Sequence, residues 1–140
     1  MYKNYPDLHL LDETDQLLLG HIFEDAVLIQ KRNGAHLLED DFYGDPSGGL
    51  ISPTNEWAVV VGEHVTIWHH RAGVSRIEHE ALRWVYALRL NEQATHVELL
   101  VDPRGTQAAI WCLNPADGSY VKVRDFPQYR DREYTEEIVW

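Results

Sequence analysis

One acidic run contains the residues whose types and spacing best suit binding to a charged partner. It combines four carboxylates with two aromatic rings: Glu39, Asp40, Asp41, Phe42, Tyr43 and Asp45. Carboxylates steer the approach of a basic protein and pair with its Lys and Arg side chains, while desolvated aromatic rings supply contact area. The run therefore predicts a surface that binds a basic protein.

The chain's eight histidines are the second set with chemical potential. His64, His69, His70 and His79 lie close together in the sequence, near Glu78 and Glu80, and two or three histidines can bind a metal when the fold brings them together. However, the chain lacks a His-Glu-x-x-His motif, paired cysteines and a calcium-loop spacing. We interpret the histidines as scattered surface residues and expect no catalytic residue, cofactor or metal, with a small metal-dependent hydrolase as an alternative.

Two further aromatic segments have two possible interpretations each. Trp68 precedes His69 and His70, so it belongs either to the core or to a binding surface. The C-terminal tail ends in Trp140 and forms either a second acidic anchor or a last strand packed on the sheet. The binding residues it would supply are Tyr134, Glu136 and Glu137.

The net charge of −11 is concentrated towards the N-terminus. Residues 1–50 carry 3 basic and 10 acidic side chains, and the later segments 51–100 and 101–140 each have a net charge of −2. Such a field repels nucleic acid and anionic lipid, because phosphate binding depends on Lys and Arg. The negative charge would attract a basic protein. Alternatively, it only keeps the protein soluble.

The composition is typical of a single domain over residues 1–140, large enough to bury a core without a disulfide. Cys112 is the only cysteine, and its apolar neighbours predict a buried, inert thiol. The N-terminus has no signal-peptide pattern, and no apolar run approaches the ~20 residues of a membrane span. We therefore expect a cytoplasmic protein without a membrane partner; its oligomeric state stays open.

Apolar runs of strand length, separated by turn residues, predict an antiparallel meander of at least six strands between Glu56 and Asp125. Residues 57–61 and 65–68 form one predicted hairpin, and 107–113 and 120–124 form another. The segment 108–113 is apolar on both faces and is expected at the centre, with Ala109, Trp111 and Leu113 buried. Trp57 and Trp84 are also expected in the core.

Three other segments complete the prediction. Residues 17–22 and 26–30 favour a hairpin over a helix, because a mid-helix Gly20 costs about 1 kcal/mol and β-branched residues prefer strands. A capping-box pattern at Ser75 predicts one short helix. The 25 residues between Lys31 and Trp57 have few apolar positions and predict a long binding loop.

Two resemblances follow from these motifs. The segment from Ser52 to Trp68 resembles half a β-propeller blade, and the turn Asp102-Pro103-Arg104-Gly105 with its two strands repeats the pattern. Four blades of about 40 residues exceed this chain's length, so the repeat predicts a meander and not a propeller.

The short acidic β-rich profile, the acidic aromatic run and the Ser52 to Trp68 hairpin also resemble bacterial toxin-immunity proteins of the contact-dependent or type VI secretion type. That resemblance implies stoichiometric inhibition of a basic toxin domain, often a nuclease. We predict an α+β, mostly β domain with an antiparallel meander and one or two short helices. A non-catalytic interaction module of other purpose is a further alternative to the immunity function.

Overall fold

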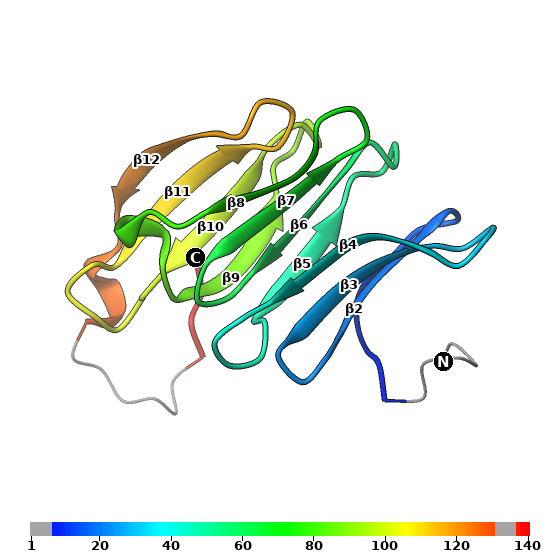
Figure 1. The fold of residues 1–140 in the computed structure, drawn as a ribbon. Coiled ribbons are helices and arrows are strands. Elements are labelled where there is room, and N and C mark those ends of the chain that lie inside the picture. The colour runs from blue at the N-terminus through cyan, green and yellow to red at the C-terminus, as the bar shows by residue number, and fades with distance from the viewer. Residues whose placement is uncertain (1–6, 131–136) are drawn as a thin grey trace.

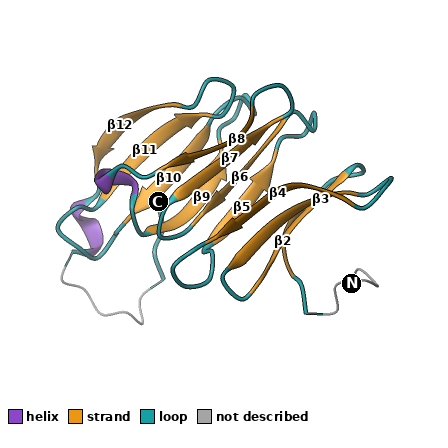
Figure 2. Cartoon of the chain, in the orientation of Figure 1, coloured by secondary structure: helices purple, strands orange, loops and turns teal. Residues whose placement is uncertain are grey.

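The computed structural model describes residues 7–130 and 137–140, and most of its regular structure is β-strand (Figure 1, Figure 2). Within these residues, twelve strands form three antiparallel sheets of four consecutive strands each. The first sheet contains β1 (His9–Glu13), β2 (Leu17–Ile22), β3 (Asp25–Gln30) and β4 (Ala35–Asp41). The second contains β5 (Gly48–Ile51), β6 (Trp57–Val61), β7 (Val65–His69) and β8 (Gly73–Ile77). The third contains β9 (Val85–Leu90), β10 (Val97–Val101), β11 (Ala109–Asn114) and β12 (Ser119–Asp125).

The three sheets pack face to face in chain order (Figure 1). The first strand of each sheet lies next to the first strand of the neighbouring sheet. A sheet of four strands in up-and-down order has the size of one propeller blade, and closed propellers need about four to eight blades. The prediction of a mostly β, antiparallel fold is confirmed. The single meander sheet was wrong, because sheets that are apolar on both faces must stack to bury them.

Two stacked interfaces and two outer clusters make up the core. β6 is buried along its whole length: Trp57, Val59 and Val61 face the third sheet, while Ala58 and Val60 face the first. This strand, and not 108–113, therefore lies at the centre of the stack. β11 is covered by the second sheet on one face and by the C-terminal segment on the other.

Most of the predicted strands are confirmed. Seven strands, β6 to β12, lie between Glu56 and Asp125, and both predicted hairpins are present. Ala109 and Leu113 are buried, whereas Trp111 and Cys112 are only half-buried. Burial, with a smaller contribution from Glu98, raises the pKa of the Cys112 thiol, which keeps it protonated.

The N-terminal hairpin of β2 and β3 is also confirmed. Gly20 is required there by close packing, because a Cβ at this position would lie 2.7 Å from the carbonyl oxygen of His9 on β1. The glycine that argued against a helix therefore allows β1 to approach β2.

The helix predicted at Ser75 was wrong. Residues 73–77 form β8, which pairs with β7 along its whole length, and the described residues contain no α-helix. The only helical turns among them are the 3₁₀ turns η1 (Glu80–Leu82) and η2 (Pro127–Tyr129). The side chain of His79 caps η1 by accepting a hydrogen bond from the amide of Ala81, at 3.1 Å. Pairing with β7 outweighs a four-residue capping pattern.

The long loop predicted between Lys31 and Trp57 was also wrong, because it contains β4 and β5. β4 is an edge strand on which only Leu38 is fully buried, so its apolar alternation is weak. β5 begins with two glycines because it is tightly packed between its neighbours. A Cβ on Gly48 or Gly49 would lie 2.6 Å from Leu88 of the third sheet or Leu19 of the first, respectively.

Candidate protein-binding site

The acidic run divides between two faces of β4 and the connection that follows it. Glu39 pairs with Val27 and Asp41 with Asp25, so both carboxylates lie on the outer face of the first sheet. Asp40 lies between them and points towards the second sheet. Strand alternation therefore gives neighbouring acids different surroundings.

Asp40 is the centre of a charge network between the first and second sheets. Its carboxylate accepts hydrogen bonds from Thr66 and from Arg76, and His64 Nε2 lies 2.8 Å from its Oδ2. His64 is buried, and its Nδ1 lies 3.1 Å from Glu63. Only 11% of the Asp40 side chain is exposed, so most of its contacts are within the fold and its expected contact with a partner stays a prediction.

The network continues to the loops. Glu63 accepts a hydrogen bond from Arg83 Nη2 at 3.1 Å, and Arg76 Nη1 donates to Glu78 at 3.0 Å. A path of hydrogen-bonded side chains thus joins Arg76, Asp40, His64, Glu63 and Arg83. It fixes the connection before β9 relative to β4.

The pKa values of both carboxylates beside His64 are lowered. Burial disfavours the charged form of Asp40, but hydrogen bonds from Arg76, Thr66 and His64 outweigh it and hold the pKa below its usual value. For Glu63 the hydrogen bond to His64 is the main cause, and Arg83 adds to it. Both groups therefore stay ionised as parts of the fold.

Phe42 and Trp68 are buried in the core. Phe42 is therefore not exposed to a partner as expected, and Trp68 takes the core position of its two alternatives. The Phe42 ring stacks on His64 with centroids 4.0 Å apart and an interplanar angle of 7°. It packs so closely that a Cβ on Gly62 would lie 3.1 Å from the ring. Trp68 contributes to the same interface between the first and second sheets.

Exposed aromatic side chains gather where five connections meet, which we name the loop end: residues 23–24, 42–47, 62–64, 78–84 and 102–108. Backbone hydrogen bonds tie these connections together, from Val85 to Gly62 at 2.8 Å and from Asp102 to Trp84 at 3.3 Å. The amide of Gly44 donates to Glu24 at 2.9 Å. Three aromatic rings are exposed at the loop end, and a fourth is exposed in the adjoining strand β9: Phe23 (76%), Tyr43 (74%), Trp84 (55%) and, in β9, Tyr86 (46%).

Trp84 and Tyr86 are exposed because the backbone departs from regular strand alternation. Trp84 has a φ of 57°, in the left-handed region, so its side chain turns away from the core. Tyr86 is the extra residue of a bulge, since Val101 pairs with Val85 and Leu100 pairs with Ala87. The expectation that Trp84 lies in the core was therefore wrong.

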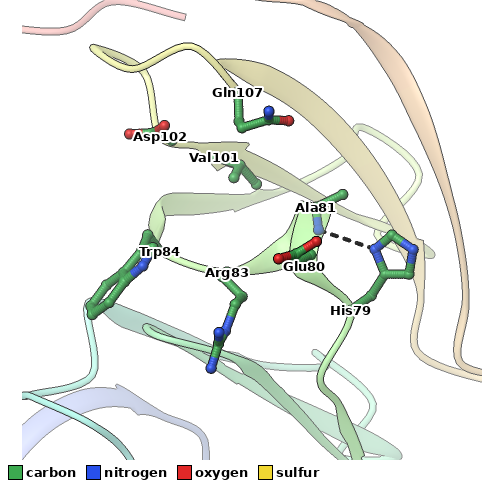
Figure 3. Close-up of a pocket in the computed structure, with 8 residues that line it drawn as sticks. All are labelled: His79, Glu80, Ala81, Arg83, Trp84, Val101, Asp102 and Gln107. Atoms are coloured by element: carbon green, nitrogen blue, oxygen red, sulfur yellow. Dashed lines mark hydrogen bonds between the residues drawn. The ribbon is translucent and has the colours of Figure 1, made fainter.

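Trp84 separates two hollows of about 490 and 460 Å³ that share its ring and Asp102. Figure 3 shows the first, between η1 and the connection from β10 to β11. Tyr43 meets the Trp84 ring edge-on, with centroids 6.1 Å apart. The part of the acidic run that reaches this site is Tyr43, with Asp45 exposed in the same connection.

Sequence reasoning missed Trp84, Tyr86 and Asp102 as surface residues. The Asp102-Pro103-Arg104-Gly105 turn was recognised, but only as a strand connection. A bulge and a left-handed φ leave no periodic signal, so the alternation of apolar residues placed Trp84 in the core and did not mark Tyr86 as exposed.

The C-terminal tail packs onto the third sheet. The Arg89 guanidinium carbon lies 4.0 Å from the Trp140 ring centroid, and Val139 donates to the Tyr129 hydroxyl at 3.0 Å. Trp140 contacts the cluster on the outer face of the third sheet. Glu137 is exposed, whereas Tyr134 and Glu136 lie outside the described residues.

A metal site has no support in the part of the chain that the structure describes. Within residues 7–130 and 137–140, no three His, Cys, Asp or Glu side chains form a group that could hold a metal ion.

No helix in these ranges is long and apolar enough to cross a membrane.

No protein-family model and no curated protein matches the sequence. The fold is similar to hydrazine synthase from Kuenenia stuttgartiensis, with a TM-score of 0.55 and 10% identity over 84% of this chain and 39% of that one. It is also similar to a candidate 6-phosphogluconolactonase from Bacteroides uniformis, with a TM-score of 0.50 and 15% identity over 83% of this chain and 39% of that one. This chain thus spans about two fifths of each neighbour, and at this identity the likeness concerns the fold alone.

Proposed function

We propose that this protein binds a basic protein through the loop end, as a cytoplasmic, stoichiometric inhibitor of a toxin domain. The observation that carries the proposal is the gathering of exposed Tyr43, Trp84 and Tyr86 in a molecule of net charge −11. Tyr and Trp are enriched at the centres of protein interfaces, and exposed apolar patches on soluble proteins mark interaction sites. The carboxylates around these rings give the surface its preference for a basic partner.

The charges at the loop end support this reading. Arg83 is neutralised by Glu63, and Arg76 by Asp40 and Glu78. Asp45 and Glu80 are exposed and make no ion pair within the described ranges. Long-range attraction therefore favours the approach of a cationic protein. Salt should weaken this attraction, because exposed charges are screened beyond about 8 Å at physiological ionic strength.

The experiment is protection of cells from a toxin. If a gene for a large toxin lies beside this gene, cells expressing its basic toxin domain should survive when the wild-type protein is co-expressed. The double variant Tyr43→Ala/Trp84→Ala should fail to protect while keeping the wild-type thermal melt. Equal protection by wild type and variant would move the interface elsewhere, and absence of protection by the wild type would contradict the inhibitor function.

A further inference from the structure

His64 is a buried titratable side chain at the centre of the loop end. It lies in the connection between β6 and β7, and only 1% of its surface is exposed. Each of its two ring nitrogens faces a carboxylate: Nε2 lies 2.8 Å from Asp40 Oδ2, and Nδ1 lies 3.1 Å from Glu63 Oε1. The ring therefore joins β4 of the first sheet to a connection of the second.

These two contacts depend on the number of protons on the ring. A neutral imidazole has one N–H donor and one acceptor nitrogen, whereas an imidazolium donates from both nitrogens. Asp40 and Glu63 stay ionised near neutral pH, so neither can donate to an unprotonated nitrogen. Both contacts are thus hydrogen bonds only when the His64 ring carries two protons.

When the ring carries one proton, the contact with Glu63 is the one that is lost. Asp40 also accepts hydrogen bonds from Thr66 and Arg76, and a lone pair on Nε2 would lie only 2.8 Å from its oxygen. The remaining proton therefore stays on Nε2, and Nδ1 turns a lone pair towards Glu63. Two acceptors 3.1 Å apart in a buried site repel each other.

The surroundings of His64 contain charges of both signs. Phe42 covers one face of the ring, with centroids 4.0 Å apart, and the face of an aromatic ring attracts a cation. The charged side chains that face His64 directly or through a carboxylate are Asp40, Glu63, Arg76 and Arg83, with Asp41 and Glu78 next to Arg76. Among these side-chain types, histidine is the one whose charge changes between about pH 5 and 8.

We propose that His64 is a pH-dependent switch: with two protons it holds Glu63 and the loop end in place, and with one proton it releases Glu63. Glu63 also accepts a hydrogen bond from Arg83, and the amide of Val85 donates to the carbonyl oxygen of Gly62 at 2.8 Å. Release of Glu63 therefore loosens the connections 62–64 and 78–84 relative to β4. This inference does not depend on the inhibitor function.

The test is an NMR pH titration of the full chain between about pH 5 and 8. The ring nitrogens of His64 report its proton count, and the amide of Val85 reports the loop end, because it donates to Gly62. We expect the Val85 signal to shift with the same midpoint as the His64 ring nitrogens. In Glu63→Gln this shift should be lost, because an amide can accept from a protonated Nδ1 or donate to an unprotonated one.

Glu39→Gln is the matched control. Glu39 forms an ion pair with His36 and is largely exposed, so this variant should shift like wild type. Any contribution from His79, which caps η1, is the same in all three proteins, and thermal melts show whether they are folded. If Glu63→Gln does not fold, the two signals of the wild type still decide. A His64 ring with the same proton count throughout, a Val85 signal that does not follow it, or an equal shift in Glu63→Gln would overturn the switch.

Discussion

The interface between the first two sheets and the loop end contain neighbouring residues of the same types with opposite surroundings. Phe42 is buried against the second sheet, where it stacks on His64, and the largely covered side chain of Asp40 contacts His64, Thr66 and Arg76 there. Asp41 and Tyr43 alternate with them along the chain and face solvent. An acidic aromatic run is therefore not one functional unit, because the pleat of the strand sends alternate side chains to the fold and to the surface.

Replacement of adjacent aromatic residues should give the largest difference between the two regions. Phe42→Ala should lower the free energy of unfolding by about 3–5 kcal/mol, because it leaves a cavity against His64. Tyr43→Ala, one residue later, should change it by no more than about 0.5 kcal/mol. Urea denaturation of both variants checks this, and equal losses would remove the distinction between core and surface.

Replacement of the adjacent acids is expected to give the next largest difference. Asp40→Ala should cost about 2–4 kcal/mol of stability, since it leaves Thr66, His64 and Arg76 without their acceptor. Asp41→Ala should cost less than about 0.5 kcal/mol, because its side chain is 84% exposed and lies 3.8 Å from Arg76. Denaturant melts that show the same small loss for both variants would mean that the network around Asp40 contributes nothing.

The tail offers a smaller contrast on the third sheet. Trp140→Ala should lower stability by about 1–2 kcal/mol through loss of apolar contact and of the Arg89 contact with its ring. Val139→Ala, on an exposed side chain beside it, is the control and should have no measurable effect. A tail that serves only as an acidic anchor would show no stability loss for Trp140→Ala.

The smallest effect is expected from pH. The pKa of Asp40 is lower in the folded state, so its ionisation stabilises the protein fully above its unfolded pKa of about 3.9. That contribution is lost as pH falls through the folded pKa. The stability difference between wild type and Asp40→Asn should therefore shrink below about pH 4, and a difference that grows on acidification would contradict the lowered pKa.

The sequence was informative where burial and alternation agree. The strands from Trp57 to Val61 and from Val97 to Val101 follow directly from their β-branched, apolar residues. β4 could not be predicted because it has only one fully buried residue. β5 could not be predicted because it begins with two glycines, which are required only by close packing against the neighbouring sheets. Of the candidate site, only Tyr43 could be predicted from the sequence. Trp84 is exposed because its own backbone has a left-handed φ, which the pattern of apolar residues does not indicate.

The most direct test of the central claim is the affinity of the basic toxin domain for this protein, measured by calorimetry for wild type, Trp84→Ala and Val121→Ala. Val121 is 63% exposed on the edge strand β12 and serves as the control for loss of an exposed apolar group. We predict that Trp84→Ala weakens binding by at least ~2 kcal/mol, roughly 30-fold, with unchanged stability, and that Val121→Ala binds like wild type. Unchanged affinity of Trp84→Ala, or an equal loss in Val121→Ala, would contradict binding through the loop end.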